Sequence, residues 1–166
     1  MRRKIFFRPE RCMFCLSCVL ACKMNSLGIP DVTKTSGKQR PIGRISMTFS
    51  RGTPWPWKCQ QCVSAPCVEA CVSGSLVQQD GQAGVVHHPE TCVGCGSCLL
   101  VCPFSAVIYH GEEKRMMKCN LCPDETIPPC VTACQSKALI CKPSDVFASE
   151  KKKEFAREMG RVREAD

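Results

Sequence analysis

The chain has 166 residues and a formal net charge of +8, and its length suits one domain or two small domains packed together. It contains seventeen cysteines but only seven Phe, two Trp and one Tyr, so bound metal or cross-links must supply part of the folding free energy. No apolar stretch is long enough to span a membrane and no secretory signal is visible. We therefore expect a soluble, cytoplasmic protein whose cysteines bind metal and do not form disulfides.

The first predicted element is the cysteine motif CMFCLSCVLAC at residues 12–22, with the spacing C-x2-C-x2-C-x3-C. Its CVLAC end suits one or two turns of helix. A connector at residues 23–58 follows, which contains several Gly and Pro residues. We expect this connector to be an insertion on the surface, with one β-like piece at Arg44–Ser50.

Three further cysteine motifs follow, at residues 59–71, 92–102 and 119–134, and each begins with C-x2-C and ends with C-x3-C. The first and third motifs of the chain are compact, whereas the second and fourth have four and seven residues between their middle cysteines. Short β-like pieces lie at Gly84–His88 and Val107–His110. The pattern predicts a small α+β fold, in which short hairpins and short helices surround bound metal.

The last predicted element is a charged helix at residues 144–166 that begins near Ser144 or Asp145. A weak apolar stripe runs along it, formed by Phe147, Phe155, Met159 and Val162. Two interpretations are open, because such a helix can be a solvated end of the chain or a docking surface for a partner protein.

The compact motifs favour 4Fe–4S clusters. Three thiolates at i, i+3 and i+6 can reach separate iron corners of a cubane, whereas one zinc ion needs four ligands around a single point. The third motif, CVGCGSCLLVCP, matches the ferredoxin run C-x2-C-x2-C-x3-C-P completely, with Pro103 in the last position. The second and fourth motifs alone could also form zinc ribbons, so a mixture of iron–sulfur and zinc sites is the alternative to four 4Fe–4S clusters.

The pairing of the motifs is not decided by their spacing. The fourth cysteine of a ferredoxin motif ligates the other cluster of its pair. Neighbouring motifs could pair, first with second and third with fourth, or the pairs could be nested, first with fourth and second with third. The second and third motifs lie 20 residues apart, whereas 36 residues separate the first motif from the second, and this difference leans towards the nested arrangement.

Three segments carry a resemblance to a known family: CQQCVSAPCVEACVSGSL, CVGCGSCLLVCPFSAV and KCNLCPDETIPPCVTACQSKAL. They resemble the four-cluster electron-transfer subunits of the dimethyl-sulfoxide-reductase and formate-dehydrogenase type. The sequence is especially similar to the compact soluble subunits that serve carbon-monoxide dehydrogenases, hydrogenases of the formate-hydrogenlyase type and tungsten aldehyde oxidoreductases. The likeness extends from about Lys4 to Cys141.

The resemblance implies two pseudo-symmetric ferredoxin-like halves within residues 1–143 and nested ligation, in which 12–22 pairs with 119–134 and 59–71 pairs with 92–102. Each cluster then takes three cysteines from one motif and the fourth from its companion. The implied ligand sets are Cys12, Cys15, Cys18 and Cys134; Cys119, Cys122, Cys130 and Cys22; Cys59, Cys62, Cys67 and Cys102; and Cys92, Cys95, Cys98 and Cys71.

The family also implies a function. We expect a non-catalytic subunit that relays electrons through four 4Fe–4S clusters. The electrons would come from a catalytic subunit that oxidises an aldehyde, carbon monoxide, formate or hydrogen, that is, a tungsten or molybdenum pterin enzyme, a carbon-monoxide dehydrogenase or a hydrogenase. They would pass to a further electron carrier or a flavin subunit. The alternative function is a redox-sensing or structural module with mixed iron–sulfur and zinc sites.

The net charge of +8 does not indicate nucleic-acid binding, because four oxidised clusters of about −2 each would cancel it. We expect Cys141, the seventeenth cysteine, to be a small buried hydrophobic residue. Trp55 and Trp57 are expected to cover the cluster held by Cys59. The three histidines, His87, His88 and His110, are expected to be strand or loop residues.

Overall fold

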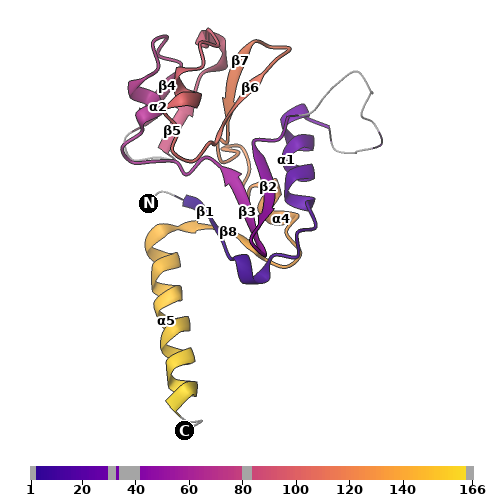
Figure 1. Ribbon diagram of the computed structural model, residues 1–166, viewed down its shortest axis with the longest axis vertical. Helices are drawn as coiled ribbons and strands as arrows, with labels where there is room; N and C mark the ends of the chain where they lie inside the picture. Colours follow the sequence, from indigo (N-terminus) through magenta and orange to yellow (C-terminus); the bar gives the residue numbers. More distant parts are fainter. Residues whose placement is uncertain (1–2, 30–32, 34–41, 80–83, 164–166) are drawn as a thin grey trace.

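The computed structural model of the protein describes residues 3–29, 33, 42–79 and 84–163. In this part of the chain the strands form four two-stranded antiparallel sheets (Figure 1). The pairs are β1 (Arg3–Phe7) with β8 (Leu139–Pro143), β2 (Ile45–Ser50) with β3 (Thr53–Lys58), β4 (Leu76–Gln79) with β5 (Gly84–His87), and β6 (Val107–His110) with β7 (Arg115–Lys118). The helices are α1 (Ser17–Leu27), α2 (Pro66–Glu69), α3 (Ser97–Leu100), α4 (Pro129–Thr132) and α5 (Ser144–Arg163), and the 3-10 turns are η1 (Pro9–Arg11) and η3 (Pro89–Thr91).

The expected small α+β fold of short strands and short helices is therefore present. The β-like pieces expected around 44–50, 84–88 and 107–110 are strands β2, β5 and β6. The apolar end of each cysteine motif forms a helix, as expected. Helices α2 and α4 begin on the prolines that precede the third cysteine of the two interrupted motifs, because a fixed φ and a missing N–H suit the first turn of a helix.

Two small apolar cores hold the elements together. The first lies among β1, β2, β8 and α4, and the second lies among β4 to β7, α2 and α3 (Figure 1). Cysteines are a large part of both cores, as the scarcity of aromatic residues predicts. The buried members are Ile5, Ile45, Cys119, Leu121, Cys130 and Leu139 in the first core, and Ala65, Leu76, Val85, Cys98, Val107 and Met116 in the second.

The connector at 23–58 differs in part from the expected surface insertion. Its first residues continue α1 to Leu27, and its last residues form the β2–β3 hairpin, which places Ile45 in the first core with 2% of its surface exposed. The hairpin closes tightly because Arg51 and Gly52, the two residues of its turn, both have positive φ (49° and 78°), as a type I′ turn requires. Residues 30–32 and 34–41 of the connector lie outside the described residues.

The two tryptophans of β3 have exposed side chains. Side chains alternate between the two faces of a strand, and in β3 the inward positions are taken by Pro54, Pro56 and Lys58. Trp55 and Trp57 therefore face outward, with 52% and 37% of their surface exposed. Neither tryptophan lines the hollow that contains Cys59, although the groove that they line shares Gln60, Pro103 and Phe104 with it. That they cover a cluster held by Cys59 stays a prediction.

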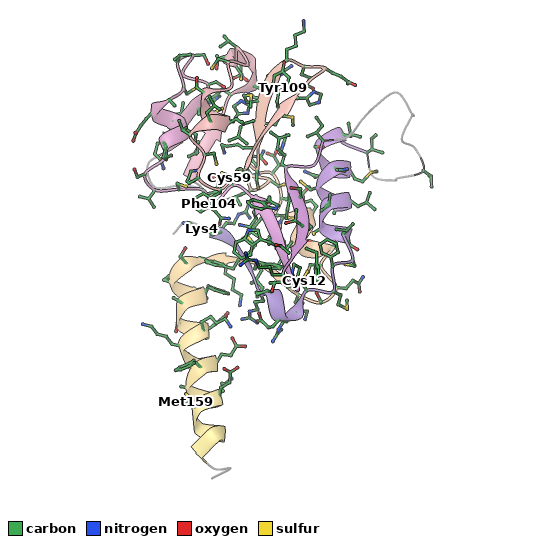
Figure 2. All side chains as sticks on the ribbon, in the orientation of Figure 1. Lys4, Cys12, Cys59, Phe104, Tyr109 and Met159 are labelled. Atoms are coloured by element: carbon green, nitrogen blue, oxygen red, sulfur yellow. The ribbon has the colours of Figure 1, made fainter. Side chains whose placement is uncertain are left out.

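The expected charged helix is present as α5, which projects away from the rest of the molecule (Figures 1 and 2). Its first half is anchored: Phe147 stacks on Phe6 with ring centroids 3.9 Å apart, and Glu154 lies 3.8 Å from Arg8. Beyond this point Phe155 and Met159 are exposed at 63% and 47%. Across the described residues, no helix combines the length and apolar character needed to cross a membrane.

Candidate metal centres

The sixteen cysteines of the four motifs gather around four hollows of similar size, which we name sites A to D. Their volumes, including the part open to solvent, are about 350, 380, 370 and 400 Å³. Site A is lined by Cys12, Cys15, Cys18 and Cys134; site B by Cys22, Cys119, Cys122 and Cys130; site C by Cys59, Cys62, Cys67 and Cys102; and site D by Cys71, Cys92, Cys95 and Cys98.

Each site thus draws three cysteines from one motif and the fourth from another. These are the same sets of side chains that a nested arrangement requires. That the sets ligate clusters stays a prediction. Among the described residues, no group of three or more Cys, His, Asp or Glu side chains is placed to hold a single metal ion. Tetrahedral zinc needs four ligands, with each sulfur about 2.3 Å from one point. Cysteines spread around a hollow suit a multi-iron cluster, because each thiolate then binds a different iron atom.

The loops of the two compact motifs have the same backbone shape. The second and fourth residues after the first cysteine have positive φ in both: Phe14 and Leu16 at site A, and Gly94 and Gly96 at site D. At Gly94 a side chain is also excluded by space, because a Cβ atom there would lie 2.2 Å from the carbonyl oxygen of Lys114. The loop of site D therefore lies directly against the β6–β7 turn.

Backbone N–H groups donate hydrogen bonds to the last cysteine of each motif. Leu76 donates to Cys71 Sγ and Leu139 donates to Cys134 Sγ, both at 3.4 Å. The small and aliphatic residues that follow each motif supply these donors, since Ala106 N–H likewise lies 3.4 Å from the sulfur of Cys102. The first motif differs because α1 continues past it, and Cys22 Sγ accepts instead from Arg44 N–H at 3.3 Å. Such bonds favour the thiolate form and raise the potential of a bound cluster.

Sites A and D each present one cysteine to solvent, Cys15 and Cys95. Hydrogen bonds from the hydroxyl groups of Ser17 and Ser97 lower the pKa of these two thiols. The other thiols are more buried, and burial raises the pKa of Cys18, Cys98 and Cys122 to about 11. Metal binding at neutral pH must therefore displace protons from them.

Two buried lysines lie beside the sites. Lys58 and Lys118 are 4% and 3% exposed, and each is the last residue of a strand and directly precedes the first cysteine of an interrupted motif. Lys58 lines site B, and Lys118 lines sites C and D. Burial lowers the pKa of both lysines, and the neighbouring thiolates, mainly those of Cys59 and Cys119, oppose this shift.

Hydrogen bonds satisfy part of the donor capacity of these ammonium groups. Lys118 Nζ donates to the carbonyl oxygens of Val85 and Cys119. Lys58 Nζ donates to Gln60 Oε1 at 3.4 Å. A buried cation is costly unless a negative charge compensates it. Anionic iron–sulfur clusters in sites B, C and D would supply that charge.

Sequence reasoning missed the lysines and one histidine. The lysines could have been noticed in the sequence, because a lysine directly precedes the first cysteine of both interrupted motifs. His87 is in β5, as expected for a strand residue, but it also lines site D. His88 and His110 lie away from the four sites, and Cys141 faces Ile5 across the β1–β8 pair, where it packs against the first core as a partly buried hydrophobic residue.

Comparison with known proteins gives the family. The 4Fe–4S dicluster domain matches residues 52–144. An iron–sulfur protein of Rhodospirillum rubrum is 33% identical over 95% of this chain and 90% of its own length. The putative electron transport protein YsaA of Escherichia coli is 34% identical over 85% of this chain and 90% of its own length. One of the chains of polysulfide reductase from Wolinella succinogenes is 34% identical over 77% of this chain and 69% of its own length. The protein belongs to the 4Fe–4S dicluster family of ferredoxin-like electron-transfer subunits.

Proposed function

We propose that the chain is a non-catalytic subunit that holds four 4Fe–4S clusters, in sites A to D, and carries electrons between a catalytic oxidoreductase subunit and another redox carrier. The observation that carries the proposal is the set of four cysteine-lined hollows of nearly equal volume. Each 4Fe–4S cluster, when bound, accepts and returns one electron. All sixteen cysteines are assigned as ligands, so no iron is left open for substrate.

In the proposed relay the sites follow one another in the order A, B, C, D. Cysteines of sites A and B pack in the first core, and cysteines of sites C and D pack in the second. Cys59 of site C packs against the first core, beside Cys119 of site B, and so joins the two pairs. The exposed cysteines, Cys15 and Cys95, belong to sites A and D, the two ends of the proposed order. The ends are therefore the places where a partner can bring its own redox centre close.

The nested ligation and the two pseudo-symmetric halves are part of the proposal. The first half would join 12–22 with 119–134, and the second half 59–71 with 92–102. The β1–β8 pair, with register Phe7 to Leu139, and the β4–β5 pair, with register His87 to Leu76, support this division, because each leads into the first cysteine of a compact motif. Cluster assembly on free thiols suits a reducing compartment such as the cytoplasm.

The catalytic partner is proposed by class. The relative from Wolinella succinogenes is one chain of a polysulfide reductase, which supports a role inside a redox complex. The proposed partners are a tungsten or molybdenum pterin enzyme, a carbon-monoxide dehydrogenase or a hydrogenase on one side, and a further carrier or flavin subunit on the other. Their substrate would be an aldehyde, formate, carbon monoxide or hydrogen.

The test is metal analysis of the anaerobically purified chain together with spectra before and after dithionite. About 16 iron and 16 sulfide per chain, with reversible bleaching of the visible absorbance, are expected. About 8 iron with stoichiometric zinc would contradict the four-cluster proposal and would favour the redox-sensing or structural module with mixed sites.

A further inference from the structure

Sites A and D are entered by the same local structure. Strand β1 ends at Phe7 and turn η1 leads to Cys12, while strand β5 ends at His87 and turn η3 leads to Cys92. The backbone angles agree closely. The residue before each turn has φ and ψ of −115° and 97° in the first case and −102° and 93° in the second, and the two cysteines agree equally well. The sequences FRPERC and HHPETC are therefore equivalent stretches.

The surroundings of Phe7 and His87 are equivalent too. Phe7 faces Leu139 across the β1–β8 pair, and His87 faces Leu76 across the β4–β5 pair. The N–H of each leucine donates to a site cysteine, Cys134 or Cys71, at 3.4 Å. The phenyl ring of Phe7 lines site A and the imidazole of His87 lines site D.

The two rings differ in one property that matters for a cluster. A phenyl ring donates no hydrogen bond, whereas a neutral imidazole carries one N–H. The Nε2 atom of His87 is buried and has no hydrogen-bond partner among the described residues. A buried polar group normally finds a partner, and an orphaned one calls for an explanation. The acceptors that the hollow of site D would supply are the sulfur atoms of a cluster and its thiolate ligands.

We propose that His87 donates a hydrogen bond from Nε2 to the cluster of site D, and that this bond makes site D more easily reduced than site A, where Phe7 takes the same place. The inference rests on the proposed function, since it concerns a cluster held by that chain. Hydrogen bonds to cluster sulfur raise the reduction potential because they stabilise the added negative charge. The buried ammonium of Lys118, which also lines site D, acts in the same direction. The reduction potential is thus higher at site D than at site A, and an electron occupies the cluster of site D in preference to that of site A.

The test uses the full chain with its clusters and compares four proteins: the wild type, His87→Phe, His87→Gln and Phe7→His. Iron and sulfide are counted first. A redox titration with dithionite, followed by electron paramagnetic resonance, then gives the reduction steps. In His87→Phe we expect one step to shift so that the oxidised-to-reduced ratio rises about tenfold at a fixed potential, which is ~59 mV for one electron. His87→Gln keeps an N–H donor, so its reduction step should lie close to that of the wild type.

The reciprocal variant provides a matched control. Phe7→His should make a different step easier to reduce, because it adds a donor at site A. A spectroscopic signature tests the contact directly: the reduced wild type should show a nitrogen hyperfine coupling that changes on labelling histidine with 15N and is lost in His87→Phe. If that variant loses iron, this coupling in the wild type decides the question.

The outcomes separate the two levels of the proposal. A wild type with far fewer than about 16 iron overturns the proposed function itself. A full complement of iron with no nitrogen coupling and no shift in His87→Phe overturns the role of His87 and leaves the four-cluster relay in place. A shift without recovery in His87→Gln also overturns the hydrogen bond, since it would show that ring volume and not the donor matters.

Discussion

Lys118 places a positive charge in the interior, beside two of the four sites. Its side chain is 3% exposed and hydrogen-bonds to two backbone carbonyl groups, so it is held in place. Reduction of a cluster adds a negative charge, and a fixed cation nearby stabilises the reduced form. At an effective dielectric constant of about 20, two charges about 8 Å apart interact by roughly 2 kcal/mol. The ammonium would thus strongly influence the potentials of clusters bound at sites C and D.

Replacing this charge tests its influence. In the loaded chain, Lys118→Met should make at least one cluster harder to reduce, by about 50–100 mV, because it removes the cation and keeps the apolar stem. A redox titration measures the shift. Lys153→Met, which removes the same charge from an exposed position on α5, is the control and should change no potential measurably. Equal effects of the two variants would mean that net charge, and not the buried contact, is responsible.

Gly94 lies too close to the β6–β7 turn to carry a side chain. A methyl group there would lie 2.2 Å from the Lys114 carbonyl oxygen, whereas nothing lies within 4 Å of a methyl group at Gly96. Both glycines have positive φ, which costs an alanine roughly 1 kcal/mol. Gly94→Ala should therefore lose the iron of site D, about 4 of 16 atoms, because the loop must move off the β6–β7 turn. Gly96→Ala should keep all of its iron, and similar losses in both variants would contradict the steric argument.

Helix α5 shows how an element can be fixed at one end and unsupported at the other. Phe147 stacks on Phe6, and Arg8 lies over the Phe147 ring at 5.9 Å from its centroid. Glu150 also forms an ion pair with Lys142 of β8. Phe155, which directly follows the Glu154 that lies near Arg8, is 63% exposed. The stability of the helix as part of the fold therefore depends on its first half.

Two truncations of aromatic side chains on α5 should differ accordingly. Phe147→Ala removes a stacked ring and should lower the unfolding midpoint of the loaded chain by about 4–8 °C, corresponding to about 2 kcal/mol. Phe155→Ala should change the midpoint by no more than about 1 °C, because exposed substitutions are close to neutral. Thermal unfolding followed by circular dichroism measures both. A comparable loss in Phe155→Ala would show that the projecting half of α5 is covered, for example by a second copy of the chain.

The positions of strands and helices were largely predictable, whereas the faces they present were not. Strand β6 begins and ends at the predicted residues, and the ends of the motifs form the predicted helical turns. The outward direction of Trp55 depends on the register of β3, and the inward direction of Lys58 depends on it too. The place of His87 in site D required the β4–β5 pairing. Such facts come from contacts between distant segments, and a single sequence carries little information about them.

Across the whole molecule, the two cores are joined by a few polar contacts. The Gln61 side chain donates to the Cys119 carbonyl oxygen at 2.7 Å and accepts from Val85 N–H at 3.1 Å. It therefore connects a residue of the first core with a residue of the second. Lys118 makes a parallel connection, since it donates to the carbonyl groups of the same two residues. The distance between sites B and C is therefore held by buried hydrogen bonds.

The pairing of the motifs can be tested by removing the last cysteine of one motif. Under nested ligation Cys71 completes site D, so Cys71→Ser and Cys98→Ser should remove or alter the same reduction step. If neighbouring motifs paired instead, Cys71 would complete the cluster of the first motif, and Cys71→Ser would match Cys18→Ser. Redox titration of the three variants, with iron counted for each, compares the steps. The lining of site D by Cys71, together with Cys98 and not with Cys18, is the reason to expect the first result. Agreement with Cys18→Ser would divide the chain into a different pair of halves, one made of the first two motifs and the other of the last two.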